Sequence, residues 1–271
     1  MTTEQWLEVF RGIGKEMRAG LPAILDLETG RTAIGRGAGG DKTFPVDKWA
    51  EDIMVAAMEQ VHATNGAAFT LVSEELGTRT FGAGTQVVLV DPVDGSNNAK
   101  NGVPFFGFAI ALLDGSTLAE LKAGYVMNLA VGDEFWAVRG KGAFKNGKTL
   151  RTPDTADIVI VSYEATDPAN DLPLILPLLT SARRTRCFGS TALDLTYLAS
   201  GATSVFVTAT PSRTFDYAAG MLILEEAGGI VTDWAGSSLG SVRAGLDRTV
   251  PLLAAKNSVT HQKALALLRK N

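Results

Sequence analysis

Apolar residues recur at helical spacing in two stretches near the start of the chain. Over residues 3–20 they lie three or four positions apart, which predicts an amphipathic helix. Residues 46–64 show the same spacing and predict a second helix. Between them, residues 28–45 are rich in glycine, and we expect a mobile loop there. The apolar positions of the first helix are Trp6, Val9, Phe10, Ile13 and Met17.

Uninterrupted apolar runs follow and predict strands. Residues 68–74 and 86–91 are too apolar to leave one face in water, so we expect them at the centre of a covered sheet. Residues 104–146 contain several such runs separated by Gly, Asp and Asn turns, which predicts an antiparallel meander. After Pro153, strands and helices alternate, and we expect the helix over residues 171–182 to be broken by its prolines. The remaining predicted elements are strands at 157–164, 184–188, 203–209, 229–234 and 251–256, and helices at 190–201, 215–229 and 258–270.

This pattern predicts helices and sheets in layers, with more than one sheet. The change of character near residues 150–157 indicates a boundary there. We therefore expect a single unit of 271 residues built from two subdomains, approximately 1–152 and 153–271, that share a cleft.

Composition narrows the class of protein. The net charge of −4 argues against a partner that is nucleic acid or an anionic membrane surface. The single cysteine, Cys187, excludes an intrachain disulfide and fits a reducing compartment, and we expect it to be buried and inert. The first residues lack the apolar segment of a signal peptide, and no run approaches the length of a membrane span. We expect a soluble cytoplasmic protein.

Two familiar motifs match in letters but fail in context. Residues 142–149, GAFKNGKT, satisfy the P-loop pattern, but Pro153 follows almost at once and the flanks predict a hairpin turning at Asn146-Gly147. Residues 35–40, GRGAGG, satisfy the dinucleotide-binding pattern, but no helix follows directly. We reject a nucleotide site at both positions.

Carboxylates stand at the ends of several apolar elements. Such placement is costly unless cations neutralise the charges, and a site rich in oxygen suits Mg²⁺. Gly95 lets a ligand approach the backbone, and a short helix beginning there would offer free N–H groups to an anion. Metals and phosphate together indicate phosphoryl chemistry. The carboxylates are Glu74, Glu75, Asp91, Asp94 and Asp216.

Three alternative assignments of the segment DPVDG over residues 91–95 fit less well. A calcium-binding loop counted from Asp91 requires a glutamate at its twelfth position, where this chain has Gly102. An aspartyl nucleophile of the DxD type requires an acid where Val93 stands. A solvated β-turn would not account for so apolar a strand ending there.

The motifs carry a family resemblance. SEE (73–75), DPVDGS (91–96) and FDYAAGMLILEEAGG (215–229), in this order, resemble the inositol monophosphatase family. GSTALDL (189–195) is similar to its substrate segment, and GKGAFKNGK (140–148) to its hairpin. The resemblance spans most of the chain and is strongest to archaeal members that act on both fructose bisphosphate and inositol phosphates. It implies a layered α/β/α/β/α sandwich, a Mg²⁺-dependent phosphatase and a homodimer.

The resemblance also implies roles for residues. Two to three Mg²⁺ ions, with Mn²⁺ as a substitute, would be held in the first subdomain, and the second would contact the substrate. Ser96 and Asp47 would orient the attacking water, and Glu75 and Asp41 would support the site. The implied metal ligands are Glu74, Asp91, the Val93 carbonyl, Asp94 and Asp216, with Asp47, Glu74 and Ser96 as catalytic residues. The implied substrate-binding residues are Gly95, Ser96, Arg186, Gly189, Ser190 and Arg213.

Departures from the family concern the substrate. Animal members carry a glutamate seven residues before the last metal aspartate and a histidine three residues before it, where this chain has Ala209 and Arg213. An acceptor for a sugar diol is therefore missing and a guanidinium is present instead. Arg213 and the cluster Arg183, Arg184 and Arg186 favour binding of a second phosphate, although a solvated strand edge explains at least one of them.

We therefore expect a hydrolase of phosphate monoesters, most of all fructose 1,6-bisphosphate and inositol 1-phosphate, that needs neither nucleic acid nor membrane. A 3′,5′-bisphosphate nucleotidase is the next alternative, although no adenine platform is identifiable. A non-catalytic, metal-dependent sensor of sugar phosphates is a further one. His62 and His261 lie on predicted helices without a partner pattern, and we expect both to be structural.

Overall fold

The computed structural model describes residues 1–25, 30 and 32–269. Residues 28, 29 and 31 of the predicted loop and Lys270 of the last predicted helix lie outside the described residues. The helices are α1 (Thr3–Leu25), α2 (Pro45–Asn65), α3 (Ser96–Asn101), α4 (Pro168–Ser181), α5 (Thr191–Ala199), α6 (Thr214–Ala227) and α7 (Ser258–Leu268), with a 3-10 helix at Leu118–Glu120.

The larger sheet is formed by the first half of the chain, in the order β10-β9-β8-β7-β6-β5-β3-β4. β3 and β5 pair in parallel, and every other neighbouring pair in this sheet is antiparallel. β3 and β5 are internal, as predicted. β4 was not predicted, because its polar middle residues leave no apolar signal. The strands are β3 (Phe69–Ser73), β4 (Gly77–Phe81), β5 (Gln86–Asp94), β6 (Gly107–Asp114), β7 (Leu121–Asn128), β8 (Glu134–Val138), β9 (Gly142–Lys145) and β10 (Lys148–Leu150).

The second sheet is formed by the second half of the chain, in the order β12-β11-β13-β17-β15. Its strands β11, β12 and β13 are parallel, and β17 runs antiparallel to both of its neighbours. Two short pairs, β1 with β2 and β14 with β16, complete the described strands. The strands are β1 (Gly35–Arg36), β2 (Lys42–Thr43), β11 (Ile160–Glu164), β12 (Arg184–Arg186), β13 (Val205–Thr208), β14 (Ser212–Arg213), β15 (Ile230–Thr232), β16 (Arg248–Val250) and β17 (Leu253–Ala255).

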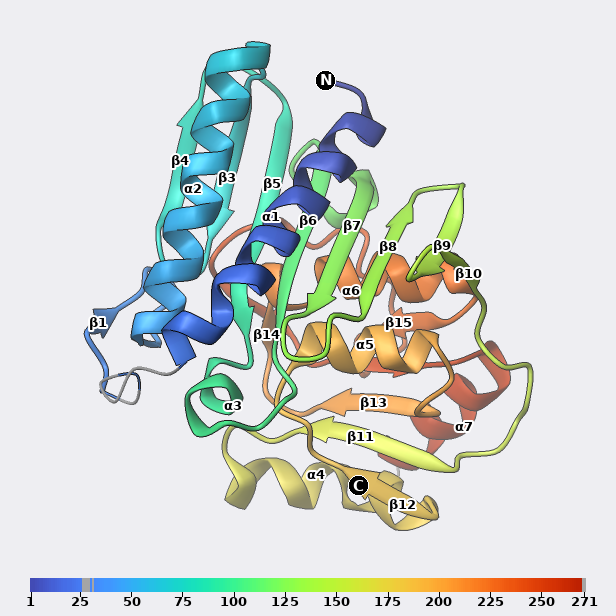
Figure 1. Cartoon of the computed structure of the whole chain (residues 1–271). Helices are drawn as coiled ribbons and strands as arrows, with labels where there is room; N and C mark the ends of the chain where they lie inside the picture. Colours follow the sequence, from blue (N-terminus) through green and yellow to red (C-terminus); the bar gives the residue numbers. More distant parts are fainter. Residues whose placement is uncertain (26–29, 31, 270–271) are drawn as a thin grey trace.

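Five layers result, and they confirm the predicted α/β/α/β/α sandwich. α1 and α2 cover one face of the larger sheet, and α5 and α6 lie between the two sheets (Figure 1). α4 and α7 cover the outer face of the second sheet. None of the helices in the described part of the chain has the length and apolar character that crossing a bilayer requires.

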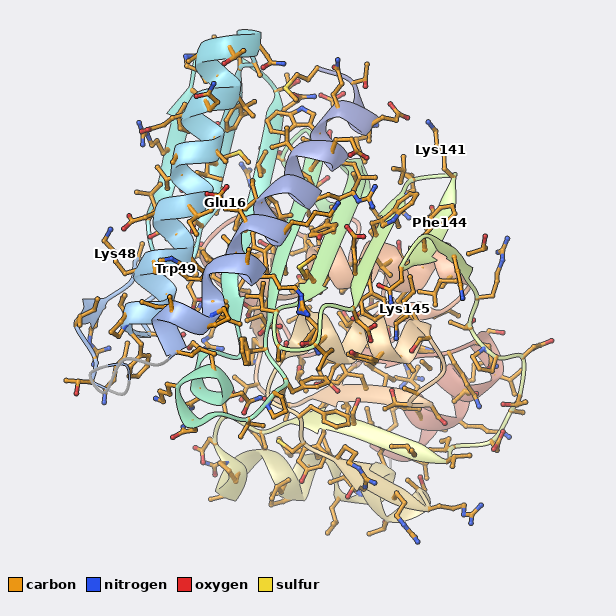
Figure 2. The ribbon with its side chains drawn as sticks, in the orientation of Figure 1. Glu16, Lys48, Trp49, Lys141, Phe144 and Lys145 are labelled. Atoms are coloured by element: carbon orange, nitrogen blue, oxygen red, sulfur yellow. The ribbon has the colours of Figure 1, made fainter. Side chains whose placement is uncertain are left out.

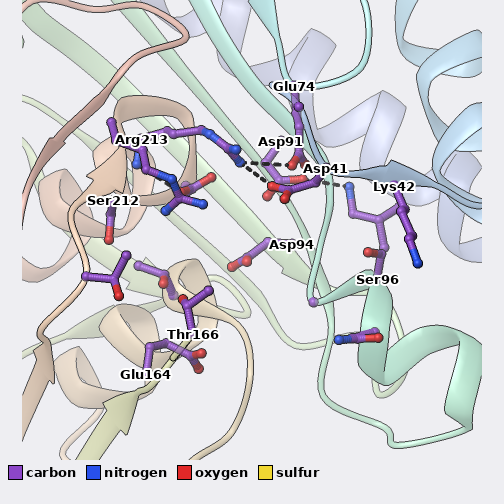
Figure 3. Close-up of a pocket in the computed structure, with 18 of the residues that line it drawn as sticks. Asp41, Lys42, Glu74, Asp91, Asp94, Ser96, Glu164, Thr166, Ser212 and Arg213 are labelled. Atoms are coloured by element: carbon purple, nitrogen blue, oxygen red, sulfur yellow. Dashed lines mark hydrogen bonds and ion pairs between the residues drawn. The ribbon is translucent and has the colours of Figure 1, made fainter. Parts of the chain in front are cut away.

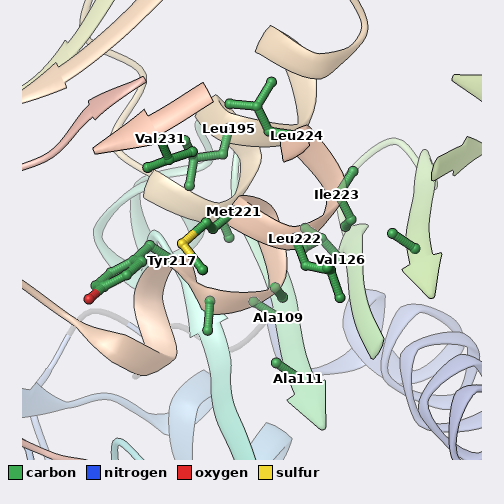
Figure 4. Close-up of a cluster of buried hydrophobic side chains, with 14 of the residues drawn as sticks. Ala109, Ala111, Val126, Leu195, Tyr217, Met221, Leu222, Ile223, Leu224 and Val231 are labelled. Carbon is green, nitrogen blue, oxygen red and sulfur yellow. The ribbon is translucent and has the colours of Figure 1, made fainter. Parts of the chain in front are cut away.

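Both faces of the larger sheet are buried, which explains its apolar strands. In β6, Phe108 and Ile110 belong to the cluster under α1 and α2, whereas Ala109 and Ala111 belong to the cluster around α6. This alternation follows from the period of two of a strand. Figure 4 shows Ala109 and Ala111 facing the side chains of α6, among them Leu222.

The helix α6 joins the two halves of the chain. It comes from the second half but packs on the strands of the larger sheet, and the core around it also contains Phe206 and Ala254 of the second sheet. The strands change sheet between residues 150 and 160, near the expected boundary. The division into subdomains at residue 152 stays a prediction.

The rejected P-loop lies in a hairpin. β9 and β10 pair with Lys145 opposite Lys148, so that Asn146 and Gly147 form a two-residue turn, both at positive φ. Phe144, labelled in Figure 2, stacks on Trp136 of β8 with ring centroids 4.0 Å apart. The hairpin is therefore structural, as predicted.

Two expectations were wrong. The prolines do not break the helix of residues 171–182, because α4 begins earlier, with Pro168 in its first turn, and continues through Pro173 and Pro177. Each internal proline costs the helix one backbone hydrogen bond, and the helix nevertheless buries Ile175 against the second sheet. Cys187 is exposed rather than buried, because it follows β12, which forms the edge of its sheet.

Candidate active site

A cavity of about 620 Å³ lies at the ends of strands from both sheets. It is lined by residues of β5, by residues that follow β3 and β11, and by the start of α6. The hairpin β1–β2 forms another part of its wall. Four carboxylates predicted from the sequence line this cavity: Glu74, Asp91, Asp94 and Asp216. Figure 3 shows the first three of them.

An irregularity in β5 directs two of these acids into one cavity. The strand was expected to end at Asp91, but it continues through Asp94, and its pairing with β6 shifts in register between these residues. In a regular strand, residues three apart point to opposite faces. The shift removes this alternation, and Asp91, Val93 and Asp94 all line the cavity.

Hydrogen bonds fix three of the acids. Oδ2 of Asp94 accepts from the Ser190 hydroxyl and from the Ala192 backbone N–H, each at 2.6 Å. Oδ1 of Asp91 accepts from the Val93 N–H at 3.0 Å. Asp216, in the first turn of α6, accepts from the backbone N–H of residue 213 at 3.0 Å. The acids are thus held in place before any ligand arrives.

The acids resist ionisation together. Burial, reinforced by the neighbouring carboxylates, raises the pKa of Glu74 and that of Asp91 well above their ordinary values. Burial raises the pKa of Asp94 to about 8 and that of Asp216 to about 6. Since the acids are oxygen donors that repel one another, this set fits a divalent cation, which would favour the ionised form of every member.

Arg213 supplies positive charge at one side of the set. The residue is 7% exposed, and its guanidinium donates to Asp41, to the Gly39 carbonyl and, at 3.4 Å, to Glu74. No group of three acidic, histidine or cysteine side chains within the described residues is arranged as a ready cation site. A cation that binds Glu74 would share this carboxylate with Arg213, which contacts its Oε1 atom.

The glycine-rich segment folds over these acids. The N–H of Gly39 donates to the Glu74 carbonyl at 2.8 Å, and that of Ala38 donates to the Glu75 carbonyl at 3.0 Å. The Thr43 hydroxyl donates to the Glu75 side chain. Asp41 thus lines the cavity, whereas Glu75 supports the hairpin from outside the cavity lining.

Two glycines bring the segments DPVDGS and GSTALDL into contact. Gly95 has φ of +91°, and a Cβ there would lie 2.8 Å from the Gly189 carbonyl oxygen. Gly189 has φ of +83°, and its own Cβ would lie 2.9 Å from Nδ2 of Asn98. Larger residues at either position would force the two segments apart.

Of the predicted pair Ser96 and Asp47, only Ser96 lines the cavity. Ser96 begins α3 and lines the cavity. Asp47 lies in the first turn of α2, accepts from the Phe44 N–H at 2.7 Å and has a pKa raised to about 7 by burial. Asp47 does not belong to the cavity lining, and no hydrogen bond joins it to Ser96 in the part of the chain that the structure describes.

The structure does not bring the predicted arginine cluster to the cavity. Arg183, Arg184 and Arg186 are exposed at the edge strand β12, where the Arg186 guanidinium donates to the Thr185 carbonyl. β12 pairs only with β11 in its sheet, so its other edge faces outward. Gly189 and Ser190 also lie outside the cavity lining and act on it through Gly95 and Asp94.

Several further residues of the cavity were missed from the sequence. Glu164 is the last residue of an apolar strand, just as Glu74 directly follows one, and could have been found by that signal. The basic residues of the lining carry no such signal, because their segments are short and polar. They are Arg36, Lys42, Lys100 and Arg248, in addition to Arg213.

The raised pKa values predict how stability depends on pH in the absence of a divalent cation. A carboxyl whose pKa rises on folding binds more protons in the folded state. The free energy of unfolding therefore falls as pH rises from about 4 to the raised pKa of each group, about 6 for Asp216 and about 8 for Asp94, by about 1.4 kcal/mol per pH unit and group. We expect the melting temperature in EDTA to fall between pH 5 and pH 8, and Mg²⁺ to raise it more at pH 8. A melting temperature in EDTA that stays level or rises over this range would contradict the electrostatic description.

Comparisons with protein families, curated relatives and solved structures all point to one family. A model of the inositol monophosphatase family matches residues 7–271. A relative from Methanothermobacter thermautotrophicus named fructose-1,6-bisphosphatase/inositol-1-monophosphatase is 32% identical over 97% of this chain and 96% of its own length. A relative of the same name from Archaeoglobus fulgidus is 33% identical over 97% and 98% of the two chains. A solved structure from Pyrococcus horikoshii, described as having similarities to inositol-1 monophosphatase, covers 98% of both chains with a TM-score of 0.83 and 26% identity.

Proposed function

The chain belongs to the inositol monophosphatase family and is a phosphoric monoester hydrolase, and from this premise we propose that it hydrolyses phosphate monoesters of sugars or cyclitols with Mg²⁺. The proposed substrates are fructose 1,6-bisphosphate and inositol 1-phosphate. The observation that supports this proposal is the convergence of four carboxylates, two of them buried and two partly buried, and several basic residues on one cavity. The carboxylates suit metal ions, and the basic residues suit the phosphate groups of a substrate.

The proposed metal ligands are the carboxylates that line the cavity. Glu74, Asp91, Asp94 and Asp216, with the Val93 carbonyl, would hold two to three Mg²⁺ ions, and Mn²⁺ would substitute. When bound, Mg²⁺ makes a coordinated water a stronger nucleophile at neutral pH and stabilises charge on phosphate oxygens.

The chain's own groups would position the substrate. The backbone of Gly95 and Ser96 borders the cavity, and its N–H groups would bind phosphate oxygens. The Ser96 hydroxyl lies beside them and would orient water. Ser190, through its hydrogen bond to Asp94, keeps one oxygen of that carboxylate engaged and the carboxylate fixed.

A bisphosphate would use the basic residues of the lining rather than the arginines of β12. Arg36 and Lys42 belong to the hairpin over the acids, and Arg248 comes from β16. The Arg213 guanidinium is held by protein acceptors, so we propose that it orders the hairpin instead of binding the second phosphate.

Phosphate release with Mg²⁺ from fructose 1,6-bisphosphate and from inositol 1-phosphate, measured in parallel, tests this proposal. We expect both to be hydrolysed and the bisphosphate to have the larger kcat/KM. Arg248→Ala should lower kcat/KM for the bisphosphate about tenfold, as for a lost charge-assisted hydrogen bond, and should affect inositol 1-phosphate less. Arg186→Ala is the matched control and should change neither value.

Two outcomes would count against this assignment. A larger effect of Arg186→Ala would restore the role predicted from the sequence for the arginine cluster. No release from either ester would overturn the proposed substrate class.

A nucleotidase is less well supported by the cavity. Phe44 is the one aromatic residue in the described part of the cavity lining, and the Lys100 ammonium lies over its ring, 3.7 Å from the centroid. That face of the ring is therefore not available to stack on adenine.

The expected cytoplasmic location and homodimer also belong to the proposal, and light scattering of the purified protein measures the oligomeric state.

A further inference from the structure

One wall of the cavity carries a carboxylate outside the proposed metal ligands. Glu164 is the last residue of β11 and lies opposite Thr208 in the parallel pairing with β13. The residue after Thr208 is Ala209. The methyl group of Ala209 cannot accept a hydrogen bond, whereas Glu164 offers a carboxylate from the adjacent strand at the same end of the sheet.

Glu164 is oriented toward the cavity. Its Oε1 accepts from the Gly189 N–H at 2.8 Å, and no other hydrogen bond to its side chain occurs among the described residues. Figure 3 shows its carboxylate beside Thr166, extending toward the side of the cavity that holds Asp94. Burial raises the pKa of Glu164 to about 7, and the Gly189 N–H opposes this rise.

Two neighbouring hydroxyl groups on this wall, those of Thr208 and Thr210, have protein partners. The Thr208 hydroxyl accepts from the Leu252 N–H at 2.9 Å. The Thr210 hydroxyl donates to both carboxylate oxygens of Asp171, at 3.0 Å each. Glu164, in contrast, keeps one oxygen for a ligand.

The negative charge of Glu164 favours the hydroxyl groups of a substrate over its phosphate group. A carboxylate repels a phosphate group and accepts strong hydrogen bonds from hydroxyl groups. Asp94, a proposed metal ligand, lines the same cavity as Glu164. An ester whose phosphate is bound near Asp94 could therefore place its carbon skeleton beside Glu164.

We propose that Glu164 is a specificity-determining residue that accepts hydrogen bonds from hydroxyl groups flanking the ester oxygen, so that the cavity selects esters of polyols. This role rests on the proposed phosphatase function. Glu164 would supply the hydrogen-bond acceptor that the methyl group of Ala209 cannot provide.

A pair of esters with the same carbon skeleton tests this role. Glycerol 2-phosphate has a hydroxyl on each carbon beside the ester carbon, and isopropyl phosphate has none. For the wild-type protein with Mg²⁺, we expect kcat/KM to be higher for glycerol 2-phosphate. Glu164→Gln should reduce this preference about tenfold or more, mainly through KM, and should leave isopropyl phosphate nearly unchanged.

Glu51→Gln is the matched control. Glu51 is a buried glutamate that, like Glu164, accepts from a backbone N–H at 2.8 Å, in this case that of Leu76; it also accepts from the Ser73 hydroxyl and does not line the cavity. Its substitution should leave the preference unchanged. If Glu164→Gln does not fold, Glu164→Asp keeps the charge, shortens the side chain and gives the same comparison.

The outcomes separate the two hypotheses. Equal losses for both esters in Glu164→Gln, or an unchanged preference, would overturn the role of Glu164 while leaving the phosphatase function in place. If the wild-type protein hydrolyses neither of these esters nor the two proposed substrates, both hypotheses fail.

Discussion

Asp94→Asn is expected to reduce kcat/KM for phosphate release by about 10²- to 10³-fold or more, because the charge of Asp94 is lost while its shape is kept. Asparagine has the same size, and its side-chain oxygen can still accept from the Ser190 hydroxyl and the Ala192 N–H. The fold should therefore be maintained. Steady-state release of phosphate from inositol 1-phosphate, with Mg²⁺ varied, measures the loss.

The same substitution should have the opposite effect on stability. Burial disfavours the charged form of Asp94, whose pKa is about 8, so a neutral residue removes an unfavourable term that grows as pH rises. In EDTA at pH 8, Asp94→Asn should melt at a higher temperature than the wild-type protein, and Mg²⁺ should stabilise it less. Asp154→Asn, at an exposed position, is the control and should change neither property. A variant that is inactive but less stable in EDTA would indicate a structural role instead.

Gly95→Ala is expected to destabilise the protein by about 2–4 kcal/mol and to lower activity strongly. The substitution adds a methyl group at a φ of +91°, and the new Cβ would lie 2.8 Å from the Gly189 carbonyl oxygen. The segment that would bind phosphate must then move away from the start of α5. Thermal melting and phosphate release together measure this effect.

Gly102→Ala is the matched control for that prediction. Gly102 lies at the other end of α3 with φ of +74°, but nothing lies within 4 Å of its added Cβ. It should cost about 1 kcal/mol from backbone strain alone and leave activity nearly intact. Equal effects of the two substitutions would show that the contact with Gly189 has no particular importance.

The sequence was sufficient for the elements with strong local patterns. α2 begins and ends within one residue of its predicted bounds, and β3 and β5 are central because their apolar runs need burial on both faces. Elements without such a pattern were missed, among them the edge strand β4 and the two-residue strands β1, β2 and β14. A polar or very short strand is stabilised by its partner strand and has no pattern of its own.

The acids of the cavity also had a local signal. Each stands where an apolar strand or helix begins or ends, and the ends of such elements meet at the edges of layers. Glu74, Asp91, Asp94 and Asp216 line one cavity for this reason. The same rule would have found Glu164.

The tertiary structure alone decided the basic and substrate-facing residues. Arg186 looked suitable because it precedes the segment GSTALDL, but β12 is an edge strand and carries it away from the cavity. Arg248 lines the cavity although nothing near it in sequence marks it, because β16 pairs with β14 just before α6.

The sequence by itself therefore determined the layers of the fold and the acidic residues of the cavity, since both follow from burial within a single segment. The tertiary structure decided which arginines face the cavity and which residue lies beside Glu164, since this depends on the pairing between strands far apart in the chain. Glu164 lies opposite Thr208 through pairing across 44 residues, for example, and no local pattern encodes that register.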